Sequence, residues 1–504
     1  MCSILGVLEF EETFIDKTAL LEKALTILSN RGPDEQNISE INSYCCMSGN
    51  RLIIRGSYGI GSMPFKYNNA LCYYNGEIYN YKKWSKGISS DGEIILPLYE
   101  KYDVNFLQFI EGEFAISIWD DNKKCLILAT DPFGSKPIYF SLSNQKLIWA
   151  SSESAINEIL QHEYCAITKS NTFLHSQSIQ TPYTSFSGIW RIPPGHFILA
   201  NKENVNLYCY NYWKEGSYSS RNTKLLFREL ENSLISRLNF NGTIAIPLSA
   251  GIDSGIIAFI ADRLGIKYHI FSLVEMFGYK TVEAKYIYER LDKLKHAQDI
   301  TLLSCNETEY WDALSEIYSN DYYISEKYDG GAIPMHTVVK AIHTKGLKVL
   351  IDGTGGDELF HGYTFRKDFK PVDEFPMFWK RNYYYSIPST LVDFASKSDL
   401  AGAHFSIETR YPFLSRNIYS CISNLIINDT LKWPLRKYLL ENTHYGKPNE
   451  VDRQKKFGFM LERIDRWEVV RDMKLAWLKA NKLNDHPNLP ALKFPFKIGL
   501  KVNL

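Results

Sequence analysis

Residues 244–257 read Ile-Ala-Ile-Pro-Leu-Ser-Ala-Gly-Ile-Asp-Ser-Gly-Ile-Ile, and the second half of the chain is organised around them. The apolar run 243–248 predicts a buried strand, residues 249–254 a tight loop of small and polar residues, and the following pattern a helix that Gly265 ends. A strand, a tight loop and a helix N-terminus together favour an anion site, because free backbone N–H groups and the helix dipole point at one place. An ordinary strand-to-helix turn is the alternative for this stretch alone.

Bulk properties indicate an ordinary globular protein of more than one domain. A chain of 504 residues is too long for one core, and we predict domains at residues 1–210 and 211–504. A net charge of +0 gives no electrostatic reason to expect nucleic acid or a membrane surface as a partner. Nine scattered Cys without zinc-like spacing, no signal-peptide pattern and no membrane-length apolar run favour a reducing, cytoplasmic location.

Cys2 follows Met1 directly, and its small side chain permits removal of Met1. The residue would then carry both a thiol and a free α-amine of pKa near ~8, so the amine could serve as the general base for its own side chain. A buried structural cysteine is the alternative.

The sequence pattern of the first half predicts mostly antiparallel sheet with a few helices. Helical spacing runs over residues 16–29, and Asn75-Gly76, taken alone, is most often a hairpin turn. Ser90-Asp91 would cap an amphipathic helix. The expected short strands are residues 4–8, 71–74, 114–119, 126–129, 138–140 and 147–150.

Six short motifs occur here in order, over about 140 residues. They are Met1-Cys2-Ser3-Ile4, Arg31-Gly32-Pro33-Asp34, Arg51-Leu52, Asn75-Gly76-Glu77-Ile78-Tyr79-Asn80, Ser90-Asp91 and Asp131-Pro132-Phe133-Gly134-Ser135-Lys136-Pro137. Together they resemble the class II glutamine amidotransferase domain of asparagine synthetases, and the loop 249–254 resembles the pyrophosphate loop of ATP pyrophosphatases. The resemblance implies an α+β N-terminal-nucleophile (αββα) domain, followed by an α/β parallel-sheet ATP-pyrophosphatase domain with a largely helical C-terminal part.

The resemblance assigns catalytic roles to Cys2 as nucleophile and to Asn75 and Gly76 as the oxyanion hole. Arg51 would bind the glutamine α-carboxylate and Asp91 the α-ammonium, with Glu77 nearby. The implied glutamine-binding set is Arg51, Ile54, Asn75, Gly76, Glu77 and Asp91.

In the second half, helices alternate with strands and predict a parallel sheet, whose ligands bind beyond the carboxyl ends of the strands. The loops after strands 243–248 and 348–351 should therefore face one crevice, where Asp253 and Asp357 would hold Mg²⁺. Helix capping is the alternative for each Asp. The resemblance implies Lys455 at the ATP α-phosphate, with Lys456 as the fallback. The implied ATP-binding set is Leu248, Ser249, Ala250, Gly251, Asp253, Ser254, Val274, Asp352 and Gly353.

Several positions depart from the family pattern. Asn30 and Met63 replace the usual residues beside the glutaminase motifs, and Ala250 replaces the first loop Gly, which matters if that residue needs φ > 0. Thr354 stands where asparagine synthetases carry Glu. Residues 327–330 lack the Thr and Arg that would hold aspartate.

The implied function is ATP-dependent amidation of a carboxylate through an acyl-AMP, with ammonia from glutamine, and aspartate is the default acceptor. The departures leave open another carboxylate, on a sugar acid, a peptide or a specialised metabolite, and a non-catalytic relative is a third reading. ATP and Mg²⁺ are the expected cosubstrate and metal, and a homodimer is left open.

Overall fold

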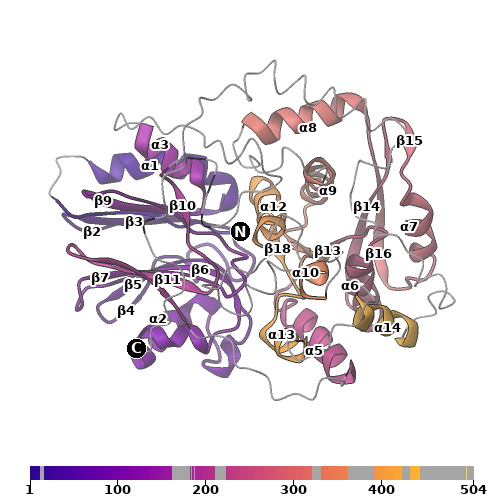
Figure 1. Ribbon diagram of the computed structural model, residues 1–504, viewed down its shortest axis with the longest axis horizontal. Helices are drawn as coiled ribbons and strands as arrows, with labels where there is room; N and C mark the ends of the chain where they lie inside the picture. The colour runs from indigo at the N-terminus through magenta and orange to yellow at the C-terminus, as the bar shows by residue number, and fades with distance from the viewer. Residues whose placement is uncertain are drawn as a thin grey trace, which may run out of the picture.

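Two structural units lie side by side in the computed structural model (Figure 1), which describes residues 1–11, 16–161, 182, 184, 186, 188–210, 223–319, 331–360, 391–422, 432–442 and 495. The first unit holds two stacked sheets, and the second holds one sheet with helices around it. The predicted boundary at 210/211 coincides with the edge of a described range and stays a prediction.

Both sheets of the first unit are antiparallel and six-stranded. In spatial order, one contains β10 (Trp190–Arg191), β8 (Tyr139–Leu142), β9 (Lys146–Ala150), β1 (Leu5–Glu9), β3 (Cys45–Arg51) and β2 (Glu35–Asn42). The other contains β12 (Val205–Cys209), β11 (His196–Ala200), β7 (Cys125–Thr130), β6 (Gly112–Asp120), β5 (Ala70–Ile78) and β4 (Phe65–Tyr67).

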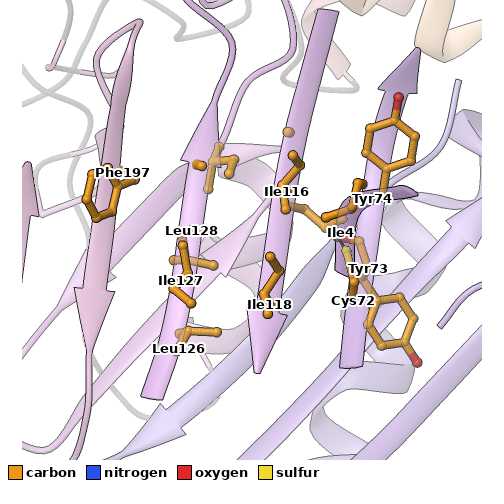
Figure 2. Close-up of a cluster of buried hydrophobic side chains, with 14 of the residues drawn as sticks. Ile4, Cys72, Tyr73, Tyr74, Ile116, Ile118, Leu126, Ile127, Leu128 and Phe197 are labelled. Atoms are coloured by element: carbon orange, nitrogen blue, oxygen red, sulfur yellow. Dashed lines mark hydrogen bonds between the residues drawn. The ribbon is translucent and has the colours of Figure 1, made fainter. Parts of the chain in front are cut away.

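The sheets pack face to face and helices cover their outer faces (Figure 1). Figure 2 shows Ile4, next to β1, packed with Ile116 and Ile118 of β6, so that one core joins the two sheets. α1 (Lys17–Ile27) and α3 (Glu153–Gln161) lie on one side and α2 (Ile95–Tyr102) on the other. Short 3₁₀ turns are η1 (Ser29–Arg31), η2 (Tyr81–Lys83), η3 (Asp91–Ile94) and η4 (Asp103–Gln108).

The second unit has a mainly parallel sheet, as the alternating pattern predicts. Its strands are β15 (Tyr279–Lys280), β14 (Tyr268–Met276), β13 (Ile244–Pro247), β17 (Val349–Ile351) and β18 (Glu408–Arg410), with β16 (Ala297–Cys305) also paired to β14. Only the β14–β15 pair is antiparallel among these pairings.

Helices cover both faces of this sheet, because successive strand residues point to opposite sides. Ala245 of β13 packs in one apolar cluster, with α8 and α9, while Ile244 and Ile246 pack in another, with α5, α6, α13 and α14. The helices are α5 (Thr223–Ser236), α6 (Ile252–Arg263), α7 (Ala284–Leu291), α8 (Glu307–Ser319), α9 (Ala332–Thr344), α10 (Gly356–Leu359), α12 (Leu391–His404), α13 (Arg416–Ile422) and α14 (Trp433–Asn442).

The strand predicted at residues 71–74 is longer than expected. Asn75 and Gly76 continue it within β5 and pair with Ala115 and Phe114 of β6, so the turn that Asn-Gly favours in isolation does not form. β18, which is only three residues long, was not predicted. In the described part of the second unit, residues 391–442 contribute three helices, in line with the expected helical C-terminal part. Among the described residues, no helix has the length and apolar character to cross a membrane.

Candidate active sites

Cys2 lies immediately before β1, half-buried, and Asn75 of β5 reaches it from the other sheet. The backbone N–H of Cys2 donates to Oδ1 of Asn75 at 3.1 Å. Removal from water raises the pKa of the Cys2 thiol, while the nearby N-terminal ammonium acts to lower it. If Met1 is removed, its ammonium leaves with it, and the backbone nitrogen of Cys2 becomes the α-amine beside the thiol.

Asn75 and Gly76, the predicted oxyanion donors, lie next to each other in β5. Asn75 is fully buried, and its Nδ2 has no hydrogen-bond partner among the described residues. A free buried donor is costly unless a ligand uses it. Gly76 has φ 142°, and a Cβ there would lie 1.9 Å from the backbone oxygen of Glu113, so this position requires glycine.

One cavity brings together most of the predicted glutamine-binding residues. Its lining includes Cys2, Arg51, Ile54, Gly76, Glu77 and Asp91. It also includes Arg55, which the motifs did not single out, and Glu408 from the second unit. Hydrogen bonds fix the side chain of Arg51: its guanidinium donates to Glu35 at 2.9 Å and to the carbonyl of Ile60 at 2.8 Å.

The two acidic residues of the cavity share a guanidinium. Nη2 of Arg55 lies 3.0 Å from Oε2 of Glu77 and 2.7 Å from Oδ1 of Asp91. Burial raises the pKa of Glu77, and the cations of Arg410 and Arg55 oppose that rise.

The two loops of the second unit meet, as predicted. β13 and β17 are parallel neighbours, so the loops after them start at the same edge of the sheet. A Cβ on Gly353 would lie 3.1 Å from Cβ of Asp253, and one on Gly356 would lie 2.3 Å from its Oδ1. Ala250 fits its place in the loop, because it is not among the described residues with positive φ, the backbone conformation that would have required glycine there.

Three N–H groups of the first loop are engaged within the protein. Ser249 donates to Oγ of Ser254 at 3.1 Å, Ala250 to Oε2 of Glu283 at 3.1 Å, and Gly251 to Oγ of Ser249 at 3.0 Å. A phosphate that used the N–H of Ala250 would therefore have to displace the carboxylate of Glu283.

Asp253 and Asp357 come together around a cation that the sequence pattern did not indicate. Nζ of Lys432 lies 2.5 Å from Asp253 and 2.7 Å from Asp357, and Lys432 is buried. The pKa of Asp253 is raised to about 7, chiefly by burial and also by the charge of Asp357, against the lowering effect of Lys432. The same pair of carboxylates raises the pKa of Lys432, against the effect of burial.

The second loop begins at Asp352, whose backbone N–H and both carboxylate oxygens are hydrogen-bonded. Its N–H donates to the carbonyl of Arg410 at 2.9 Å, and Ser398 donates to Oδ2. Thr354 folds back onto it, donating from its N–H at 2.9 Å and its hydroxyl at 3.1 Å to Oδ1. Thr354 thus supplies a hydroxyl turned to Asp352 where the family pattern has a carboxylate.

β18 touches both sites. The guanidinium of Arg410 lies 2.7 Å from Glu408 and 2.9 Å from Glu77 in the first cavity, while its carbonyl accepts from Asp352 in the second site. A single three-residue strand therefore joins the glutamine cavity to the second loop.

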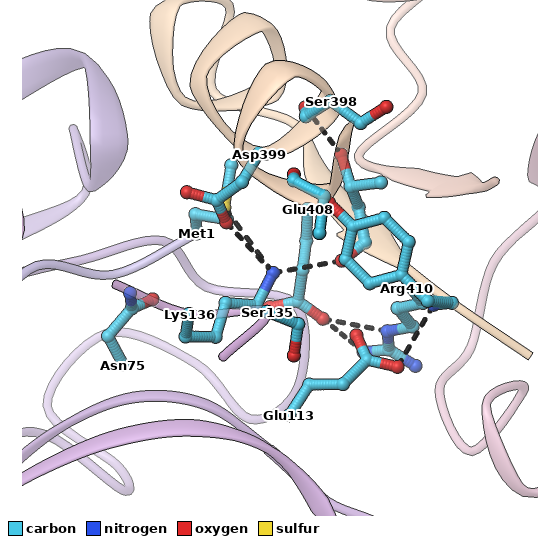
Figure 3. A network of polar contacts seen from close by, with 12 residues as sticks. Met1, Asn75, Glu113, Ser135, Lys136, Ser398, Asp399, Glu408 and Arg410 are labelled. Carbon is cyan, nitrogen blue, oxygen red and sulfur yellow. Dashed lines mark hydrogen bonds and ion pairs between the residues drawn. The ribbon is translucent and has the colours of Figure 1, made fainter. Parts of the chain in front are cut away.

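Further buried ion pairs hold the two units together (Figure 3). Nζ of Lys136 lies 3.1 Å from Asp399 of α12, and Arg31 lies 2.8 Å from the same carboxylate. Arg237 lies 3.0 Å from Glu113. Glu113, Lys136, Arg237 and Asp399 are all at most 3% exposed, so this contact is part of the folded core.

Comparison with known proteins finds two domain families in order. The glutamine amidotransferase domain family matches residues 1–213, and the asparagine synthase family matches residues 226–390. The glutamine-hydrolysing asparagine synthetase of Zea mays is 26% identical over 499 residues, covering 91% of this chain and 77% of the maize protein. The chain therefore carries a glutamine amidotransferase domain followed by an asparagine synthase domain, and it is similar over most of its length to a glutamine-hydrolysing asparagine synthetase.

Two fungal proteins similar to this chain are named amidases, not asparagine synthetases. Amidase chyE of Penicillium rubens is 29% identical over 383 residues, and amidase chry2 of Gibberella zeae is 27% identical over 386 residues. Each match covers 69% of this chain and 56% of the fungal protein. The chain thus spans little more than half the length of these two relatives.

The structure describes part of the site that the resemblance implies. Leu248, which directly follows β13, and Val274 of β14 are both buried. Lys455, Lys456 and residues 327–330 lie outside the described residues. Arg55 and Lys432 are the functional candidates that sequence reasoning missed, and a second Arg four residues after Arg51 was the only available signal.

Proposed function

We propose that the chain is a glutamine-dependent amidoligase, which releases ammonia at Cys2 and attaches it to a carboxylate activated by ATP. The observation that carries the proposal is the Cys2 cavity. Cys2 and Gly76 line this cavity, and Asn75, whose Nδ2 has no hydrogen-bond partner among the described residues, accepts from the N–H of Cys2. The same chain also matches the asparagine synthase family.

At the first site, Sγ of Cys2 forms a bond to the amide carbon of glutamine while its proton passes to the α-amine freed by Met1 removal. Nδ2 of Asn75 and the N–H of Gly76 stabilise the negative oxygen of the tetrahedral intermediate. The carbon–nitrogen bond then breaks, and ammonia leaves with the transferred proton. Water cleaves the remaining thioester, giving glutamate and the free thiol.

At the second site, a carboxylate oxygen attacks the α-phosphorus of ATP, pyrophosphate leaves, and ammonia displaces AMP from the acyl-adenylate. Asp253 and Asp357 would hold Mg²⁺, because they supply hard oxygen ligands and Oδ1 of Asp253 has no hydrogen-bond partner among the described residues. The ammonium of Lys432, which pairs with both carboxylates, would have to move away from them when the ion binds. Within the described ranges, no group of three or more His, Cys, Asp or Glu could hold a metal by itself. The phosphates would therefore complete the coordination, and the ion would offset their charge.

Aspartate is the first candidate for the acceptor, because the match to the maize asparagine synthetase extends over 91% of the chain. Thr354 favours a second candidate, a carboxylate other than aspartate, since a hydroxyl cannot replace a carboxylate as a base or a cation ligand. The similarity to two fungal proteins named amidases supports the same alternative.

The test is pyrophosphate release by the purified chain with MgATP, glutamine and a panel of carboxylates that includes aspartate. Release that depends on one carboxylate, together with the matching amide in the products, supports the proposal and identifies the acceptor. Asparagine formation at an ordinary kcat/KM of roughly 10⁴ M⁻¹s⁻¹ or more would establish aspartate. Glutamine hydrolysis and pyrophosphate release both absent would indicate a non-catalytic relative.

A further inference from the structure

Arg55 occupies the end of the cavity where the amide donor's α-ammonium is expected to bind. Its guanidinium contacts both acidic residues of the cavity, at 3.0 Å from Glu77 and 2.7 Å from Asp91. It also lies 4.8 Å from the ring centre of Tyr81, within cation–π distance. The side chain is only 16% exposed, so three partners fix it inside the cavity wall.

The remaining oxygens of the two carboxylates are also engaged. Oδ2 of Asp91 accepts from the hydroxyl of Tyr74 at 2.8 Å and from the N–H of Ile78 at 2.7 Å. Oε1 of Glu77 lies 2.9 Å from Arg410. Both carboxylates are therefore neutralised and hydrogen-bonded before any ligand enters.

A donor that carries an ammonium group meets two obstacles here. It must replace a guanidinium that binds two carboxylates at once, and until it does so it faces a cation of its own sign in a site shielded from water. A donor with a hydrogen atom in place of the ammonium meets neither obstacle. Its carboxylate can still approach the cation of Arg51, which its hydrogen bonds to Glu35 and Ile60 hold in the cavity wall, and its amide can still reach the Asn75–Gly76 pair.

We propose that Arg55 is a specificity-determining residue that fills the α-ammonium subsite, so that the cavity prefers a primary amide bearing a carboxylate but no ammonium. This inference rests on the proposed hydrolysis at Cys2 and names the class of amide donor. Glutamine remains a substrate that enters only by displacing Arg55.

The experiment compares two amides, glutamine and its des-amino analogue 4-carbamoylbutanoate, by steady-state ammonia release in wild type, Arg55→Leu and Arg55→Lys. Wild type should hydrolyse the des-amino amide with a kcat/KM at least equal to that for glutamine. Arg55→Leu should raise kcat/KM for glutamine about tenfold or more, mainly through KM, which corresponds to about 1.4 kcal/mol. The des-amino amide should gain no such advantage.

Arg55→Lys is the matched control, because it keeps a cation at the subsite and should keep the wild-type order of the two amides. Circular dichroism and ammonium-supported pyrophosphate release identify folded variants, and Arg55→Met replaces Arg55→Leu if the latter does not fold. A wild type that prefers glutamine, with no gain or a loss in Arg55→Leu, would overturn the inference and leave glutamine hydrolysis intact. If no folded variant hydrolyses either amide, the proposed function at Cys2 fails and the inference falls with it.

Discussion

Replacing Lys432 by Met should destabilise the second unit strongly, because it removes the only cation found between Asp253 and Asp357 among the described residues. The ammonium lies 2.5 and 2.7 Å from the two carboxylates, and Lys432 is 7% exposed. Met keeps a similar length and apolar stem, so the change isolates the charge.

The size of the effect follows from burial. Removing one partner of a buried ion pair typically costs about 3–5 kcal/mol, because the other partner stays buried without compensation. A chain of two units does not unfold in a single two-state step, so the melting temperature is a better observable than the free energy of unfolding. At about 2 °C per kcal/mol for a large domain, the loss corresponds to about 6–10 °C.

The loss should also depend on pH. Burial raises the pKa of Asp253 to about 7, so the folded state holds this proton more tightly than the unfolded state. Its contribution to stability is present at low pH and declines as pH rises from about 4 to about 7. Without Lys432 the pKa of Asp253 should rise further, so the variant should lose more relative to wild type at pH 8 than at pH 6.

Differential scanning fluorimetry at pH 6 and pH 8, with and without MgATP, measures these effects. Lys280→Met is the matched control, because Lys280 is 63% exposed and pairs with Glu275 at 3.5 Å, so its melting temperature should stay near that of wild type. MgATP should restore part of the melting temperature lost in Lys432→Met, by binding the two carboxylates that no longer have a counter-ion. A melting temperature for Lys432→Met equal to that of the control would refute the reasoning.

Three further substitutions test the two sites. Cys2→Ala should abolish ammonia release from glutamine and leave ammonium-supported amide synthesis, and Met1 retained on the active protein by intact-mass analysis would contradict the α-amine mechanism. Gly76→Ala should reduce glutamine hydrolysis by two orders of magnitude or more, roughly the effect of losing an oxyanion donor, because its Cβ collides with the backbone of Glu113; near-normal hydrolysis would exclude Gly76 from the oxyanion hole. Thr354→Glu should raise any aspartate-dependent asparagine formation, and no increase would show that another position limits aspartate use.

The motifs predicted the residues around Cys2 because each motif fixes a local backbone feature. Gly76 is needed where β5 passes close to Glu113, and the parallel pattern of β13 and β17 brings two distant loops to one sheet edge. The strand pairing itself was misread at Asn75-Gly76, since a dipeptide preference for turns yielded to pairing with β6.

Arg55 and Lys432 could not be predicted in the same way. Arg55 meets Asp91 across 36 positions, and Lys432 meets Asp253 across 179. No periodicity or spacing rule links residues at such separations, because only the packing of complete elements decides which charges face each other. Each of the two residues neutralises a pair of carboxylates, so the charge balance of each candidate site differs from the one that the sequence pattern implied.

The buried charges between the two units limit how such a protein can be rearranged. Glu113 and Lys136 on one side find their counter-ions, Arg237 and Asp399, on the other. A glutaminase unit joined to a foreign partner would leave a charge sealed from water without its counter-ion, at several kcal/mol for each ion. Chimaeras built by exchanging whole units should therefore fail to fold unless the residues on both faces of the contact are transplanted together. For the same reason, substitutions on one face are tolerated only with matching substitutions on the other, so the two units cannot evolve independently.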